Sequence, residues 1–165
     1  MVISGSVPVN WNRADYENLQ YFKQPIKQEE INTWRDQGYY HQSFSGWMYD
    51  SRNPMPEFVN AVAEHIGLHN CGFVIYRMDT LDIMPTHVDH YETYERVFNV
   101  PRDRINRALV MLEDWQAGHY LEVDGVSYNN WRAGDYVVWS ADVPHAAANI
   151  GRAPRYTLQI TGDFT

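Results

Sequence analysis

The segment MPTHVDH, residues 84–90, places an imidazole and a carboxylate one residue apart, at His87 and Asp89. Side chains two residues apart on an extended strand point to the same face, so both can reach one cation from a rigid edge. These two residues therefore form half of a candidate metal site. His90 is adjacent, but it alternates to the opposite face and is not expected to be a ligand.

A second histidine supplies the missing ligand. His145 ends the segment WSADVPH (139–145), which follows a β-rich run where a strand could return to the first one. Two histidines and one carboxylate on one side of a metal leave open coordination positions, as in the facial triad of non-haem Fe(II) oxygenases. Arg155 lies ten residues beyond His145, and Thr157 shares its strand face.

Together these elements resemble the Fe(II)- and 2-oxoglutarate-dependent dioxygenases, whose pattern is His-x-Asp, a long gap, His, and a later Arg-x-Ser/Thr. The resemblance implies that His87, Asp89 and His145 bind Fe(II) as the catalytic metal. It also implies that Arg155, assisted by Thr157, holds the far carboxylate of 2-oxoglutarate through its planar guanidinium fork. The expected reaction consumes O2, converts 2-oxoglutarate to succinate and CO2, and hydroxylates a C–H bond of a small molecule or a peptide side chain.

Three segments are most similar to the aspartyl/asparaginyl β-hydroxylase branch of that superfamily: GHYLEV (118–123), WRAGD (131–135) and residues 145–155. That branch often lacks the triad carboxylate, whereas Asp89 is present here. The substrate is therefore not inferred from the branch.

Two further residues are candidates for binding the cosubstrate. Arg107 shares a strand face with apolar residues that are expected to point into the barrel, and a charge there needs a partner. In the β-hydroxylase branch an arginine on the matching strand approaches the metal-bound end of 2-oxoglutarate, which implies a similar role here, or a role toward the substrate. The alternative is a salt bridge to an acid such as Asp82 or Glu122. Asn149 is either a group that supports the site or an ordinary turn amide.

The composition favours a single strand-rich domain. The chain has 165 residues, 15% of them aromatic, which suits one β-rich core. The net charge of −8 makes a nucleic-acid partner unlikely, because nucleic-acid binding depends on clustered Lys and Arg. Cys71 is the only cysteine, so no intrachain disulfide or thiolate zinc cage is possible. No leader and no membrane-spanning run is seen, which predicts a soluble cytoplasmic protein. The sequence does not determine its oligomeric state.

The pattern of short strands separated by turns, with helices first, predicts a mainly β sandwich or jelly roll. The resemblance implies that this fold is a double-stranded β-helix (jelly roll, cupin-like) with N-terminal supporting α-helices. Residues 1–165 form one domain, with an arm and supporting helices in 1–70 and the jelly-roll catalytic core in 71–165. Helices are expected at 28–38 and 57–68. Strands are expected at 45–48, 73–78, 105–113, 119–123, 127–131, 135–140, 146–150 and 155–161, with turns at Asp124-Gly125 and Ala133-Gly134.

Two other functions fit the same pattern. A cupin-type dioxygenase or isomerase would use the metal without 2-oxoglutarate and would need no buried Arg155. A non-catalytic jelly-roll module would bind a carbohydrate or peptide through its aromatic residues. Residues 91–104 are expected to form either a mobile substrate lid or a solvated connector. His119 faces either the barrel or solvent.

Overall fold

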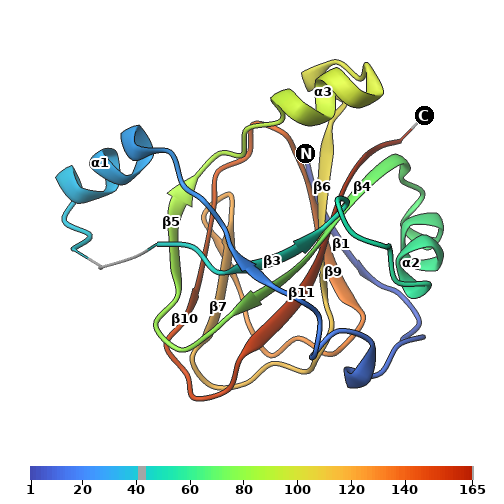
Figure 1. Cartoon of the computed structure of the whole chain (residues 1–165), viewed down its shortest axis with the longest axis horizontal. Helices are drawn as coiled ribbons and strands as arrows, with labels where there is room; N and C mark the ends of the chain where they lie inside the picture. The colour runs from blue at the N-terminus through green and yellow to red at the C-terminus, as the bar shows by residue number, and fades with distance from the viewer. Residues whose placement is uncertain (41–43, 165) are drawn as a thin grey trace.

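Two antiparallel sheets form the body of the protein, seen in a computed structural model that describes residues 1–40 and 44–164 (Figure 1). The larger sheet has seven strands in the order β1-β9-β6-β11-β4-β3-β2, and the smaller has four in the order β5-β10-β7-β8. Most neighbouring strands are distant in the sequence, as a double-stranded β-helix requires. The predicted fold class is confirmed.

The strands of the larger sheet are β1 (Val2–Ser6), β2 (Phe22–Lys23), β3 (Trp47–Asp50), β4 (His69–Met78), β6 (Asn106–Met111), β9 (Asp135–Ser140) and β11 (Arg155–Asp163). Those of the smaller sheet are β5 (Ile83–His87), β7 (His119–Val123), β8 (Val126–Tyr128) and β10 (His145–Asn149). The predicted ranges for β7 and β9 are confirmed at both ends. The turn at Asp124-Gly125 is also confirmed, since both residues have positive φ and join β7 to β8 as a two-residue hairpin.

Helices lie outside the two sheets. They are α1 (Gln28–Asp36), α2 (Phe58–Ile66) and α3 (Glu92–Phe98), with 3-10 turns η1 (Arg13–Asp15) and η2 (Arg102–Arg104). The helices predicted at 28–38 and 57–68 are therefore confirmed with shorter ends. Gly67 ends α2 in the left-handed conformation, at φ 85°, which glycine adopts without steric cost. No helix in the described residues is both long and apolar enough to cross a membrane.

The larger sheet is buried on both faces. On its outer face, Val59 and Val62 of α2 pack against Ile75, Leu158 and other apolar residues of the central strands. Its inner face meets the smaller sheet, where Leu109, Met111 and Trp139 contact Leu121 and Val123. Each fully buried side chain of this size contributes roughly 1.5–3 kcal/mol of transfer free energy. The central strands of the larger sheet, β6 and β11 among them, are therefore fixed by a core on each side.

The N-terminal part of the chain contributes more than an arm and helices. β1 pairs with β9, which places Val2 opposite Trp139, and β3 pairs with β4, which places Tyr49 opposite Ile75. Three strands from residues 1–70 thus extend the larger sheet at both edges. The sequence of β1, VISGS, shows little alternation, because most of its side chains stay at the surface.

The interpretation of residues 91–104 as a long polar connector is wrong. The segment contains α3 and η2, and its residues Tyr91, Tyr94 and Val100 are buried with Ile105 and Ala141 in a small core. Tyr91 and Tyr94 are three residues apart, which is the helical spacing that indicates this core in the sequence. The role of this segment as a substrate lid stays a prediction.

Candidate metal centre

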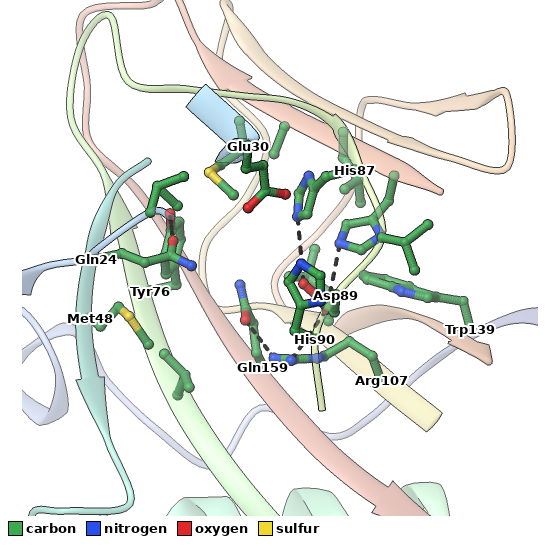
Figure 2. Close-up of a pocket in the computed structure, with 18 of the residues that line it drawn as sticks. Gln24, Glu30, Met48, Tyr76, His87, Asp89, His90, Arg107, Trp139 and Gln159 are labelled. Atoms are coloured by element: carbon green, nitrogen blue, oxygen red, sulfur yellow. Dashed lines mark hydrogen bonds and ion pairs between the residues drawn. The ribbon is translucent and has the colours of Figure 1, made fainter. Parts of the chain in front are cut away.

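Three side chains converge at one end of the smaller sheet (Figure 2). His87 ends β5, His145 begins β10, and antiparallel pairing sets the two residues opposite each other. Asp89 follows β5 by two residues. The ligand atoms of all three lie within 4.8 Å of one another. The structure therefore brings together the predicted His-x-Asp and the distant histidine.

Backbone carbonyls orient both imidazoles. Nδ1 of His87 lies 2.8 Å from the carbonyl oxygen of Pro85, and Nδ1 of His145 lies 3.0 Å from that of Val143. A proton on Nδ1 that donates to the carbonyl leaves Nε2 as the free electron-pair donor. Each Nε2 faces the carboxylate of Asp89. Nε2 of His87 lies 3.5 Å from Oδ1, and Nε2 of His145 lies 3.6 Å from Oδ2. Two imidazoles and a carboxylate suit a divalent transition metal such as Fe(II), so the donor set fits the implied ion.

Asp89 is a carboxylate with several partners. Nη2 of Arg107 lies 3.3 Å from its Oδ2, and the hydroxyl of Tyr91 donates to the same oxygen at 3.1 Å. Burial alone would raise the pKa of Asp89, but the charge of Arg107 and the adjacent imidazoles of His145 and His87 hold that pKa well below its usual range. The carboxylate is therefore ionised and available as a ligand at neutral pH.

Arg107 is paired, though not with the residues considered from the sequence. Besides Asp89, it donates from Nη1 to Oε1 of Gln159 at 2.7 Å. The salt bridge to an acid that the alternative predicted is present, but the acid is Asp89, since Asp82 pairs with Lys23 and Glu122 accepts from Tyr120. The strand face was predicted correctly, because Arg107 lines the cavity at the metal centre.

Arg155 is a buried cation with no anionic partner among the described residues. It is 3% exposed, its Nη1 contacts the sulfur of Met78 at 3.3 Å, and its Nε and Nη2 have no hydrogen-bond partner. The ring of Trp131 lies 5.5 Å from the guanidinium carbon. Burial lowers the pKa of Arg155 to about 10. The hydroxyl of Thr157, the next residue on this strand face, is also buried without a partner.

One cavity of about 330 Å³ joins the metal centre to Arg155. Its size is at the lower end of the range for small-molecule sites. The triad, Arg107 and Gln159 line it together with Arg155, and residues 24–27 and 30 close its other side. Gln159 was missed in the sequence, although it lies four residues beyond Arg155 and so shares its strand face.

The interpretation of Asn149 as a cosubstrate-binding residue is corrected by its contacts. Its amide nitrogen donates to the carbonyls of Met78 and Ala153, and its Oδ1 accepts from the backbone N–H of Gly151. The side chain is fully buried and does not line the cavity. Asn149 is therefore the turn amide of the alternative interpretation, and it shapes the turn that leads to Arg155.

The remaining histidines near the site have separate places. His119 is buried, with Nε2 3.0 Å from the carbonyl oxygen of Ala153 and its ring stacked near Trp131. It faces the barrel interior but does not line the cavity at the metal centre. His90 lines that cavity from its exposed side and lies outside the cluster of ligand atoms.

Comparison with known proteins supports the fold. No family model matches the chain, and no curated protein sequence matches it significantly. A crystal structure of a Pseudomonas putida prolyl-4-hydroxylase matches with a TM-score of 0.52 and 17% identity, over 92% of this chain and 96% of that one. A Bacteroides fragilis cupin protein matches at 0.43 and 12%, over 88% and 86%. A predicted Thermotoga maritima oxalate decarboxylase matches at 0.43 and 13%, over 72% and 82%.

At these identities the likeness concerns the fold alone. The chain has a double-stranded β-helix. None of these three structures supports the aspartyl/asparaginyl β-hydroxylase branch, which stays a prediction.

Proposed function

We propose that this protein is an Fe(II)- and 2-oxoglutarate-dependent oxygenase that hydroxylates a C–H bond of a small molecule or a peptide side chain. The observation that carries the proposal is one shared cavity, which holds a cluster of three ligand atoms and a buried guanidinium without an anion. A metal-binding cluster alone suits many metalloproteins. An unpaired buried cation beside it calls for a dicarboxylate that reaches both.

The three ligands would hold the metal on one face. His87 and His145 contribute Nε2, and Asp89 contributes its carboxylate, which leaves positions open toward the cavity. When bound there, Fe(II) supplies the activation of O2 that is coupled to conversion of 2-oxoglutarate into succinate and CO2. The apolar side chains Leu109 and Leu121 line the same cavity and exclude water from the reacting atoms.

Arg155 would bind the far carboxylate of 2-oxoglutarate. Its Nε and Nη2 have no partner among the described residues, so both are available for charge-assisted hydrogen bonds. The hydroxyl of Thr157 lies on the same strand face without a partner among the described residues, but it does not line the cavity, and its contact with the cosubstrate stays a prediction. Arg107 is already paired with Asp89, and we propose that it acts near the metal-bound end of the cosubstrate or on the substrate.

An anaerobic titration tests the proposal. Fe(II) is added to the apoprotein with and without 2-oxoglutarate, and visible absorption is recorded. A metal-to-ligand charge-transfer band is expected only when both are present. The Arg155→Met variant should need a much higher 2-oxoglutarate concentration to form the band. The matched control Arg152→Gln, at an exposed turn position, should form the band at the unchanged concentration. Metal binding without the band would favour the cupin-type enzyme, and no metal binding would favour the non-catalytic module.

A further inference from the structure

Glu30 is a carboxylate of the metal-centre cavity for which the described residues provide no cationic partner. It lies in the first turn of α1, is half-buried, and lines the same cavity as the triad. Figure 2 shows its carboxylate directed toward His87, and its negative charge acts on that imidazole. It is not one of the clustered ligand atoms. Glu30 therefore lies beside the three ligand side chains and is not one of them.

The position of Glu30 is fixed by the residue one helical turn later. Trp34 lies on the same face of α1 and is 2% exposed. Its ring centroid is 4.9 Å from that of Phe44 and 6.2 Å from that of His87. The buried indole anchors α1 against the open end of the barrel. Glu30 is consequently held over the cavity instead of moving freely as a surface acid.

The other charged side chains of the cavity have their own partners. Arg107 is paired with Asp89, and Nζ of Lys27 lies 3.6 Å from Oε1 of Glu92. Under the proposed function, Arg155 pairs with the far carboxylate of the cosubstrate. Glu30 then lines the cavity as a carboxylate with no direct ion pair among the described residues.

Apolar side chains elsewhere in the cavity lining suit an alkyl chain. The segment that leads into α1 contributes Pro25 and Ile26 to the cavity, and β3 contributes Met48. A methylene chain can bury its carbons against such side chains while its charged end stays paired with a carboxylate. A compound of this shape would extend from Glu30 toward the metal.

We propose that Glu30 selects a substrate that carries an ammonium or guanidinium group on a short alkyl chain. The substrate's role in hydroxylation rests on the proposed function. The preference for a cation depends only on the cavity, so the two can be tested separately.

Binding of four simple probes tests the preference. n-Butylammonium and n-butylguanidinium are compared with neutral pentan-1-ol and anionic pentanoate, on protein loaded with redox-inactive Zn(II) and 2-oxoglutarate. Affinities are measured by NMR titration. The two cations should bind most tightly, and Glu30→Gln should weaken them by about tenfold or more, since a charge-assisted bond is lost. The matched control Glu29→Gln removes an exposed charge from the same helical turn and should leave them unchanged.

Three results would overturn the inference. Equal affinity of the cationic probes for the unchanged protein and for Glu30→Gln would remove its basis. Tighter binding of pentanoate, lost in Lys27→Met, would assign the cavity an anionic substrate instead. A fall in Zn(II) affinity in Glu30→Gln, measured by competition with a chelator, would make Glu30 a metal ligand.

Failure of the proposed function gives a different pattern. If Fe(II) and 2-oxoglutarate produce no charge-transfer band while cation binding still depends on Glu30, the cavity selects cations for another reaction. If the band forms while probe binding ignores Glu30, the oxygenase proposal stands and the inference about Glu30 does not.

Discussion

Two guanidinium groups on neighbouring strands of one sheet differ in one respect, the presence of a counter-charge. Arg107 on β6 contacts Asp89 and Gln159, whereas Arg155 on β11 finds a sulfur atom and an indole ring, and no anion, among the described residues. Burial opposes the charge of both. For Arg107 the charge of Asp89 overcomes burial and raises its pKa, while burial lowers the pKa of Arg155 to about 10.

Arg107 is a buried charge that a carboxylate of the protein neutralises. Arg155 is a buried charge whose counter-charge we propose to be a bound ligand. A paired buried cation helps to hold its carboxylate, here a candidate metal ligand, in a defined place. An unpaired one weakens the folded protein, and such a cost is typical of a functional site. Under the proposed function, Arg107 belongs to the metal end of the cavity and Arg155 to the cosubstrate end.

The largest effect is expected when a metal-ligand side chain is removed, above all Asp89, the partner of Arg107. Asp89→Ala should abolish metal retention and lower the free energy of unfolding by about 3–5 kcal/mol, because Arg107 becomes an uncompensated buried charge. His87→Ala and His145→Ala should also abolish metal retention. Elemental analysis and urea denaturation measure the two quantities. The double variant Asp89→Ala/Arg107→Met is the control, and it should regain most of the stability without regaining the metal.

Removing the unpaired cation should have the opposite effect on stability. Arg155→Met should weaken 2-oxoglutarate binding by about 2–3 kcal/mol, the value of a charge-assisted fork. The apoprotein should become more stable by on the order of 1–3 kcal/mol, since a pKa lowered to about 10 reflects an unfavourable buried charge. Calorimetric titration and urea denaturation provide both values. A less stable apoprotein would mean that Arg155 has a structural partner.

Substitution of the paired arginine should act through the metal. Arg107→Met should weaken metal binding about tenfold to a hundredfold, because Asp89 loses the cation that positions it. The loss of 2-oxoglutarate affinity should be smaller than in Arg155→Met. Competition with a chelator gives the metal affinity. Unchanged metal affinity, with 2-oxoglutarate decarboxylation lost even in the absence of substrate, would instead place Arg107 on the cosubstrate.

The smallest expected effect is a dependence on pH. Burial would lower the pKa of His87, but its hydrogen bond to Asp89 and the charge of Asp89 raise it above the ordinary value of 6.5. Protonated His87 should therefore stabilise the apoprotein below about pH 6.5, and this contribution should fade as pH rises through the raised pKa. Metal binding requires neutral imidazole, so Zn(II) affinity should rise over that same interval. A Zn(II) affinity that is flat between about pH 6 and 8 would contradict this.

Local patterns in the sequence anticipated much of the site. The spacing of His87 and Asp89, the later His145, and Arg155 with Thr157 predicted residues that the structure brings to one cavity or to the strand face beside it. Alternation placed Arg107 on the inward face of its strand. The two helices and most strands were found in the same way, because a short period of apolar residues reports which side of an element is buried.

The sequence by itself determined the chemistry that is available: the types of ligand, the strand faces and the helices that carry them. Only the tertiary structure decided which charges meet. Arg107 reaches Asp89 because the chain beyond β5 crosses the open end of the barrel next to β6, and no local period encodes that approach. Arg155 has no counter-charge for the same kind of reason. Glu30 reaches the cavity because Trp34 anchors α1 there, and such a contact depends on packing between segments far apart in the chain.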